Sequence, residues 1–181
     1  MSAVLSHSDA RTVDLGAVRQ AAEGVPDPEI PVVTIGDLGI VRDVAVEHLA
    51  DGDRVVVTLT PTYSGCPATE VIAAAVATAV RRLGHDVRVR TALSPAWTTD
   101  WMSEQGRRKL ADFGISPPTG RRSASGPVPV RIASRRMTSG LPCPRCASSD
   151  THELARFGST ACKALWRCAA CGEPFDHFKA I

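Results

Sequence analysis

The alternation of apolar and polar residues predicts a small set of β-strands in the first half of the chain. Apolar side chains recur two residues apart within residues 41–49 and, more cleanly, within residues 54–60, which is typical of a strand with one buried face. Asp51 and Gly52 lie between the two runs, and an Asp-Gly pair favours a hairpin turn because glycine accepts a positive φ. Residues 87–90 alternate valine with arginine. We therefore expect two antiparallel strands and a third strand after them.

Helical periodicity marks the segments around these strands. Apolar residues recur at helical spacing in residues 13–25 and 68–83, and residues 103–113 are expected to form a further helix. For the second of these segments, Pro67 suits the first helical position and Gly84 suits the C-terminal stop. The order helix, strand, strand, helix, strand, helix predicts an α+β fold, with a sheet covered by helices on one face.

A proline-rich loop precedes the first strand and carries two acidic residues. Three prolines within residues 26–31 exclude regular structure and hold the backbone extended. Asp27 and Glu29 lie in this loop, from which they can approach Cys66 across the end of the sheet. The alternative is that both are turn-forming acids on the surface.

Two Cys-x-x-Cys pairs predict a metal-binding module at the end of the chain. Cys143 and Cys146 form one pair, and Cys168 and Cys171 form the other, at a spacing slightly over the usual range. Each pair can place two thiolates on one tetrahedral ion, and a short hairpin fits between them, as in a zinc ribbon. Zinc is favoured, with rubredoxin-type iron as the alternative. Residues 138–181 bury too little apolar surface alone, so the metal would supply much of their folding free energy.

The module also contains one cysteine and two histidines that the Cys₄ site does not use. Cys162 is either a small, partly buried apolar residue on the ribbon hairpin or a fifth, auxiliary thiol that transiently holds a metal. His152 and His177 are expected on the surface, because four cysteines already satisfy zinc. The chain has no recognisable export signal, so we expect it in a reducing compartment. Metal binding therefore explains the cysteines better than disulfide bonds do.

Cys66 is the one cysteine outside the C-terminal module, and it lies where a strand ends and a helix begins. The stretch 60–67 contains it, and Thr60 ends the preceding strand. The positive end of a helix stabilises a thiolate, which can act as a nucleophile or as a soft-metal ligand. No histidine lies nearby in sequence to act as a base. The alternative is a cysteine packed under the loop. Trp97 and Trp101 are either partner contacts or loop anchors.

Charge and hydropathy limit the classes of partner. The net charge is +2, and no apolar run approaches the roughly 20 residues that a membrane span needs. Five arginines lie in the Pro/Gly/Ser-rich segment 116–137, which we expect to be a solvated linker. Nucleic acid and membrane are therefore not expected partners, and the protein is expected to be cytoplasmic. Residues 1–12 are expected to be a flexible N-terminus.

Three segments carry a resemblance to a known family. They are residues 27–31 (DPEIP), 35–41 (IGDLGIV) and 59–67 (LTPTYSGCP), and over residues 13–115 the chain resembles the metal–sulfur cluster assembly domain of SufT-like proteins. That resemblance implies a small mixed sheet covered by helices. It also implies that Cys66, with Asp27, Glu29 and Thr60 nearby, contacts iron or an iron–sulfur cluster in transit.

Two further segments narrow the resemblance. Residues 94–101 (SPAWTTDW) and 157–164 (FGSTACKA), together with the Cys₄ ribbon, are similar to the D subunit (also called J) family of phenylacetyl-CoA oxygenase, or 1,2-epoxidase, systems. This resemblance implies a non-catalytic accessory protein in aerobic phenylacetate degradation that assists iron–sulfur or iron centre assembly. The implied partners are the oxygenase components, especially the iron–sulfur reductase, and the general iron–sulfur assembly machinery. The alternative is a structural bridging subunit.

Overall fold

The computed structural model describes residues 13–50, 52–119 and 140–179. The expected flexible N-terminus, residues 1–12, lies outside the described residues, as does most of the expected linker, residues 120–137. Among the helices that the structure describes, none is long and apolar enough to cross a membrane.

The first sheet is mixed and has three strands. Strand β1 (Val41–Leu49) pairs antiparallel with β2 (Gly52–Leu59), and β2 pairs parallel with β3 (Asp86–Thr91). The central strand is therefore β2, and the antiparallel hairpin predicted from the Asp-Gly pair is confirmed. The parallel pairing follows from the helix between β2 and β3, because parallel neighbours require a long crossover connection.

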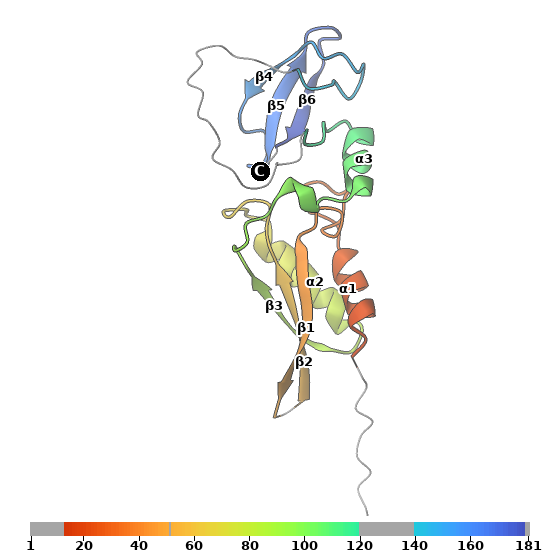
Figure 1. The fold of residues 1–181 in the computed structure, drawn as a ribbon, viewed down its shortest axis with the longest axis vertical. Coiled ribbons are helices and arrows are strands. Elements are labelled where there is room, and N and C mark those ends of the chain that lie inside the picture. Colours follow the sequence, from red (N-terminus) through yellow and green to blue (C-terminus); the bar gives the residue numbers. More distant parts are fainter. Residues whose placement is uncertain (1–12, 51, 120–139, 180–181) are drawn as a thin grey trace, which may run out of the picture.

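Two helices cover one face of this sheet (Figure 1). Helix α1 (Leu15–Glu23) packs on β1 and on α2 (Thr69–Arg81), and α2 packs on β3. The buried face of β2 carries Val55 and Val57, and the helices and strands share one core whose other members include Val18, Ala22, Val44, Ile72, Val76, Val80 and Val87. The predicted α+β class, with helices on one face of the sheet, is confirmed.

The start of α2 differs from the sequence prediction. Helical spacing runs from Ala68, and the preference of proline for the first helical position favours Pro67 there, but the helix begins at Thr69, with Ala68 as its N-cap residue. The hydroxyl of Thr69 donates to the carbonyl oxygen of Cys66 over 2.8 Å, and its backbone N–H donates to the same oxygen over 3.2 Å. The turn before the helix is thus fixed by Cys66 and Thr69, and Pro67 lies outside the helix.

A short 3₁₀ helix, η1 (Thr99–Trp101), leads into the third α-helix, α3 (Glu104–Asp112). Asp37 holds α3 against the loop before β1. Its carboxylate accepts from Lys109 over 2.6 Å and from the Ser103 hydroxyl over 3.2 Å. Burial opposes ionisation of Asp37, but these bonds outweigh burial and lower its pKa. Helix α3 therefore extends the fold beyond the sheet, on the side where the C-terminal module lies (Figure 1).

The C-terminal module is an antiparallel three-stranded sheet. Strand β5 (Lys163–Cys168) lies between β4 (Thr151–Ala155) and β6 (Pro174–Phe178). Its own core is small and consists of Leu141, Cys143, Ala164, Trp166, Cys168 and Phe175. Two of these six residues are expected metal ligands, which agrees with a module that a metal, rather than apolar burial alone, holds together.

The C-terminal sheet is docked on the α+β domain. Ser116 forms an isolated bridge with β6, in which its backbone N–H donates to the Asp176 carbonyl oxygen and its own carbonyl oxygen accepts from the Phe178 N–H. The Phe178 side chain is 1% exposed and belongs to the core of the α+β domain. Its ring lies 6.0 Å from that of Trp97. Figure 1 shows the C-terminal sheet beyond one end of the β1–β2–β3 sheet, opposite the end that carries the β1–β2 turn.

Candidate functional site

Four cysteine sulfurs converge at the tip of the ribbon. The sulfurs of Cys143, Cys146, Cys168 and Cys171 all lie within 4.8 Å of one another. The Cys143–Cys171 pair is separated by 3.8 Å and the Cys146–Cys168 pair by 3.6 Å. A tetrahedral ion with zinc–sulfur bonds of about 2.3 Å requires neighbouring sulfurs about 3.8 Å apart. Two of the sulfur–sulfur distances match this value and the others are at most 4.8 Å, so small movements would close the four sulfurs on one tetrahedral zinc ion.

The backbone after each Cys-x-x-Cys pair turns sharply to aim both sulfurs at one point. Ala147 and Gly172 have φ values of 59° and 77°, and their N–H groups donate to the carbonyl oxygens of Cys143 and Cys168. The backbone N–H of Cys171 is the main cause that lowers the pKa of Cys168 to about 7. That donor favours the thiolate, which is the form that binds a metal. Zinc bound by four thiolates has no position left for a substrate, so the site is structural.

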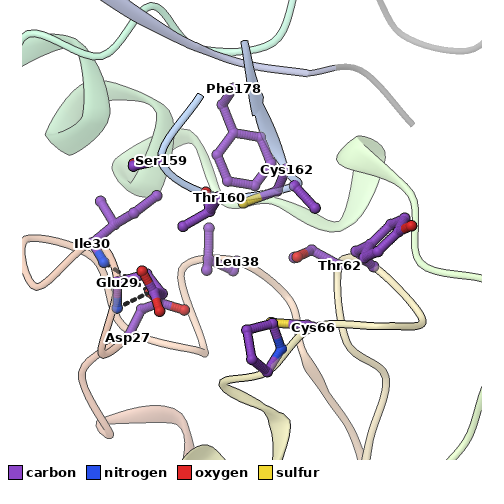
Figure 2. Close-up of a pocket in the computed structure, with 13 residues that line it drawn as sticks. Asp27, Glu29, Ile30, Leu38, Thr62, Cys66, Ser159, Thr160, Cys162 and Phe178 are labelled. Carbon is purple, nitrogen blue, oxygen red and sulfur yellow. Dashed lines mark hydrogen bonds between the residues drawn. The ribbon is translucent and has the colours of Figure 1, made fainter. Parts of the chain in front are cut away.

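A second candidate site lies at the boundary between the two domains. A cavity of about 180 Å³ is lined by Cys66 and Asp27 from the α+β domain and by Cys162 from the ribbon. Figure 2 shows these side chains around one hollow, with Phe178 and Leu38 beside them. The full lining is Asp27, Glu29, Ile30, Leu38, Thr62, Tyr63, Cys66, Pro67, Ser159, Thr160, Ala161, Cys162 and Phe178.

Asp27 serves both the turn and the cavity. Its Oδ1 atom accepts from the backbone N–H groups of Glu29 over 2.9 Å and Ile30 over 2.8 Å. These two bonds fix the proline-rich loop and leave Oδ2 available. Burial is the largest influence on the carboxyl group and raises its pKa, although the two N–H donors oppose that shift. Glu29 also lines the cavity, but its side chain is exposed.

Cys66 lies at the end of the loop that leads into α2. Its backbone N–H donates to the Tyr63 carbonyl oxygen, and its side chain is half-buried against the core of the α+β domain. It lines the cavity described above and a smaller hollow that Asp27 also lines. Thr60 is placed differently. It lines a neighbouring pocket with Trp97, and its backbone N–H donates to the Ile40 carbonyl oxygen.

The structure adds residues to the cavity that the sequence analysis did not single out. Thr62 is buried and lines the cavity, as does Phe178 from the last ribbon strand. The position of Thr62 within the stretch 60–67 was a signal that could have found it. No local pattern marks Phe178, because its neighbours in space come from the other domain.

The structure shows where the two ribbon histidines and the two tryptophans lie. His152 is exposed, but the expectation of a surface position for His177 is wrong. His177 is buried, its Nδ1 lies 3.1 Å from the Ser116 carbonyl oxygen, and burial lowers its pKa. Trp97 is a loop anchor whose Nε1–H donates to the Leu38 carbonyl oxygen over 2.8 Å. Trp101 has the Arg42 guanidinium over its ring, 3.5 Å from the ring centroid.

Two family models match the chain. The model described as iron–sulfur cluster assembly protein matches residues 16–91, and the model described as PaaD zinc beta ribbon domain matches residues 119–179. The first match contains both Asp27 and Cys66, and the second contains all four clustered cysteines and Cys162. The protein therefore has a zinc ribbon behind a domain similar to iron–sulfur cluster assembly proteins.

Two solved structures are each similar to a part of the chain. One is a domain of unknown function, DUF59, from Bacillus anthracis, 27% identical, with a TM-score of 0.47, covering 53% of this chain and 90% of that one. The other is a Mycobacterium tuberculosis protein described as associated with Fe–S complex assembly and repair. It is 30% identical, with a TM-score of 0.35, covering 60% of this chain and 95% of that one. Both TM-scores are too low to assign the fold.

A relative from Escherichia coli (strain K12) matches across both domains. It is named as the D subunit of 1,2-phenylacetyl-CoA epoxidase and is 49% identical over 158 residues, which cover 87% of each chain. The match is long enough to include the assembly domain, the docking residues and the ribbon together. The chain therefore belongs to the family of 1,2-phenylacetyl-CoA epoxidase D subunits.

Proposed function

We propose that this protein is a non-catalytic accessory subunit of a phenylacetyl-CoA epoxidase system in aerobic phenylacetate degradation. In this proposal it assists the assembly of an iron–sulfur or iron centre in the oxygenase or its reductase. The relative's name supports the assignment to phenylacetate degradation. The match to iron–sulfur cluster assembly proteins supports a role in assembling a metal centre. Its partners would be the oxygenase components, especially the iron–sulfur reductase, and the general iron–sulfur assembly machinery in the cytoplasm.

The observation that carries the proposal is the cavity that joins a thiol to a buried carboxyl group. Cys66 and Asp27 both line it, and neither belongs to the Cys₄ cluster. Thiolate is a soft ligand that suits iron, and a protein that only delivers a metal must leave part of the coordination open for the recipient. A half-buried thiol beside a cavity meets that need. Cys66 is therefore the proposed contact for the metal in transit.

The ribbon has a different part in this proposal. Cys143, Cys146, Cys168 and Cys171 would hold a permanent zinc ion that stabilises residues 138–181. The assembly domain would occupy residues 13–115, and residues 116–137 would link the two. A closed Cys₄ site cannot exchange its ion without losing the fold it supports, so the cargo metal needs a separate site.

A second candidate function is a structural subunit that bridges oxygenase components without handling metal. The exposed apolar side chains of the ribbon favour it, since Phe157 is 65% exposed and Leu154 is 49% exposed. Aromatic side chains such as Phe157 are enriched where proteins contact partners. The two candidates differ in whether the Cys66 thiol is needed.

Replacing Cys66 by serine in cells that produce the epoxidase components tests the proposal. We expect the variant protein to accumulate as the wild type does, while the iron and sulfide content of the purified reductase or oxygenase falls and phenylacetyl-CoA epoxidation is lost. Ser64→Ala is the matched control, because Ser64 is exposed in the same loop and does not line the Cys66 cavity. Normal metal content in both client proteins from the Cys66→Ser strain would refute the assembly role and favour the bridging role.

A further inference from the structure

The cavity beside Cys66 contains a second thiol, and that thiol belongs to the other domain. Cys162 lies just before β5 of the ribbon, 96 positions after Cys66, yet both line the same hollow of about 180 Å³. Both side chains are half-buried and pack against the core of the α+β domain. Figure 2 shows the two cysteines and Asp27 around this hollow. Two sulfurs and a carboxylate thus face one space from three separate segments.

The docking of β6 fixes the position of Cys162. The carbonyl oxygen of Cys162 accepts from the Lys179 N–H over 2.9 Å, directly beyond the end of β6. That strand is held in turn by the backbone bonds of Ser116 and by the burial of Phe178 in the α+β core. The thiol is therefore placed by the packing between the domains.

The loop before Cys162 is also ordered by its own hydrogen bonds. The N–H of Gly158 donates to the Lys163 carbonyl oxygen over 2.8 Å, and the N–H of Lys163 donates to the Thr160 carbonyl oxygen over 3.2 Å. The Thr160 hydroxyl lies 3.1 Å from the Cys162 sulfur. A hydroxyl donor at that distance can stabilise a thiolate, so the loop presents Cys162 to the cavity as a usable ligand.

The charges around the cavity favour a cation between these groups. The Asp27 carboxylate lines the cavity, and Cys66 and Cys162 would each add a negative charge there as thiolates. Glu29 adds another negative charge beside Asp27. Lys163 is close enough to lower the pKa of Asp27, but its ammonium is paired with Asp176 over 3.0 Å. A divalent metal in the cavity would remove both the repulsion and the desolvation cost of the thiolates.

Among the described residues, only the four ribbon cysteines already lie close enough together to share one ion. We propose that iron draws Cys66, Cys162 and Asp27 together at this cavity to form an interdomain site, with one thiolate from each domain and a carboxylate oxygen as ligands. The inference rests on the proposed function for the identity of the metal as iron. It goes further by making the ribbon part of the cargo site. Water takes up about 30 Å³ in the liquid, so the cavity can hold an ion with several waters or a small cluster. Those waters are the positions that a recipient protein's ligands would replace.

The site is tested on the purified full-length protein whose ribbon carries one equivalent of zinc. Co²⁺ is added without oxygen, because cobalt bound by thiolate gives a sulfur-to-metal charge-transfer absorbance. We expect one cobalt beyond the zinc, with zinc retained as measured by elemental analysis. Cys66→Ser and Cys162→Ser should each weaken cobalt binding at least about tenfold and roughly halve the charge-transfer absorbance, and the double variant should lose it. Ser64→Ala should bind as the wild type does.

Asp27→Asn provides an independent variant in case a cysteine variant disturbs the fold. An amide oxygen can still accept the bonds from Glu29 and Ile30, while the negative charge is removed. We expect weaker cobalt binding with an unchanged charge-transfer absorbance at saturation. Addition of Fe²⁺ alone, or of Fe²⁺ with sulfide, to the wild type then separates an ion from a cluster, because only a cluster gives the visible absorbance of bridging sulfide.

The outcomes separate this inference from the proposed function. If Cys162→Ser binds cobalt with wild-type affinity and absorbance, the interdomain site is wrong, even where Cys66→Ser still abolishes maturation in cells. If both cysteine variants lose the metal in solution but cells with Cys66→Ser load their clients normally, the site stands and the assembly role is wrong. Displacement of the ribbon zinc as the only event on cobalt addition would also overturn the site.

Discussion

The two cysteine-containing sites of this protein differ in almost every physical respect. The ribbon site gathers four sulfurs within 4.8 Å, and its members come in pairs from two tight turns of a single module. The interdomain cavity has two half-buried thiols and a buried carboxyl group, drawn from segments far apart in the chain, around a space of about 180 Å³. The four thiolates of the first site would saturate a zinc ion, whereas the proposed second site would leave ligand positions open for a recipient.

If the proposed function holds, this difference explains how one chain would keep one metal and release another. A saturated thiolate site stabilises the fold that forms it, so loss of the ion costs the module its structure. A partly filled site can pass its ion on, because a recipient can add ligands before the donor lets go. The contact between the domains connects the two sites, since β6 completes the ribbon sheet and also places Cys162 at the cavity.

The largest expected effect comes from breaking the saturated site. Cys168→Ser removes a buried thiolate whose sulfur faces that of Cys146, and we expect loss of zinc together with loss of ordered structure in β4, β5 and β6. Elemental analysis gives the zinc content, and amide hydrogen exchange reports the order of these strands. Cys162→Ser is the matched control, because it removes a ribbon thiol outside the cluster and should keep one zinc. A Cys168→Ser variant with a full, tightly held zinc would contradict the assignment.

The next largest effect is expected from weakening the packing of the C-terminal sheet against the α+β domain. Phe178 is 1% exposed in the core of the other domain, so Phe178→Ala should lower the free energy of unfolding by about 3–5 kcal/mol. Urea unfolding measures the loss. Zinc content should stay at one equivalent, because Phe178 lies outside the ribbon's own core. Phe178→Leu is the control for volume and should cost less. If the alanine variant is as stable as the wild type, the docking does not contribute to stability.

A smaller effect is expected from the tryptophan that supports the cavity wall. Trp97 donates to the Leu38 carbonyl oxygen, and Leu38 lines the cavity. Trp97→Phe leaves that buried oxygen without this donor, which should cost about 1–3 kcal/mol of unfolding free energy. Thermal and urea unfolding measure the change. Trp101→Phe is the control, since Trp101 is only half-buried and the Arg42 guanidinium lies over its ring, where phenylalanine can still present an aromatic face. Equal losses of unfolding free energy in both variants would show that the Trp97 hydrogen bond to Leu38 does not stabilise the cavity wall.

The smallest effect concerns the pH dependence of the interdomain contact. His177 is buried beside Ser116, and burial lowers its pKa below the ordinary 6.5. The unfolded chain therefore binds a proton at a higher pH than the folded protein does. The contribution of neutral His177 to stability is fully present above about pH 6.5 and falls as the pH drops toward the folded pKa. For one proton the slope cannot exceed about 1.4 kcal/mol per pH unit.

His177→Asn sharpens this measurement. Asparagine can keep a donor near the Ser116 carbonyl oxygen but does not titrate. Unfolding free energies between pH 7.5 and 5.5 should therefore fall less steeply in the variant than in the wild type. Identical slopes would show that another group sets the pH dependence in this range.

The sequence predicted local features well because their causes are local. The period-two runs placed β1 and β2, the Asp-Gly pair placed the turn between them, and Ser103 begins α3 as its N-cap. The expected Cys₄ cluster formed because each Cys-x-x-Cys pair sets its own geometry within one turn. The start of α2 was missed by two residues, since the Thr69 hydroxyl bond to Cys66 is a side-chain choice that periodicity does not record.

Features that join distant segments could not be read in this way. Ligand counting in the ribbon leaves His177 without a role and so predicts a surface position, yet the docked domain buries it. Trp97 left two interpretations open until its indole N–H was placed on the Leu38 carbonyl oxygen, 59 positions earlier in the chain. In both cases the deciding neighbours lie far away along the chain, and no sequence spacing encodes a contact of that length.

The sequence by itself thus determined the elements, the α+β class, the four zinc-ribbon cysteines and the importance of Cys66 and Asp27 as candidates. These follow from backbone propensity, hydrophobic period and the short range over which one metal ion organises its ligands. Only the tertiary structure decided that Cys162 faces the same cavity as Cys66 and that the ribbon docks through Ser116 and Phe178. Any surface of complementary shape could bury the Phe178 ring or pair with the free edge of β6. The surface that does so is formed only after both domains have folded.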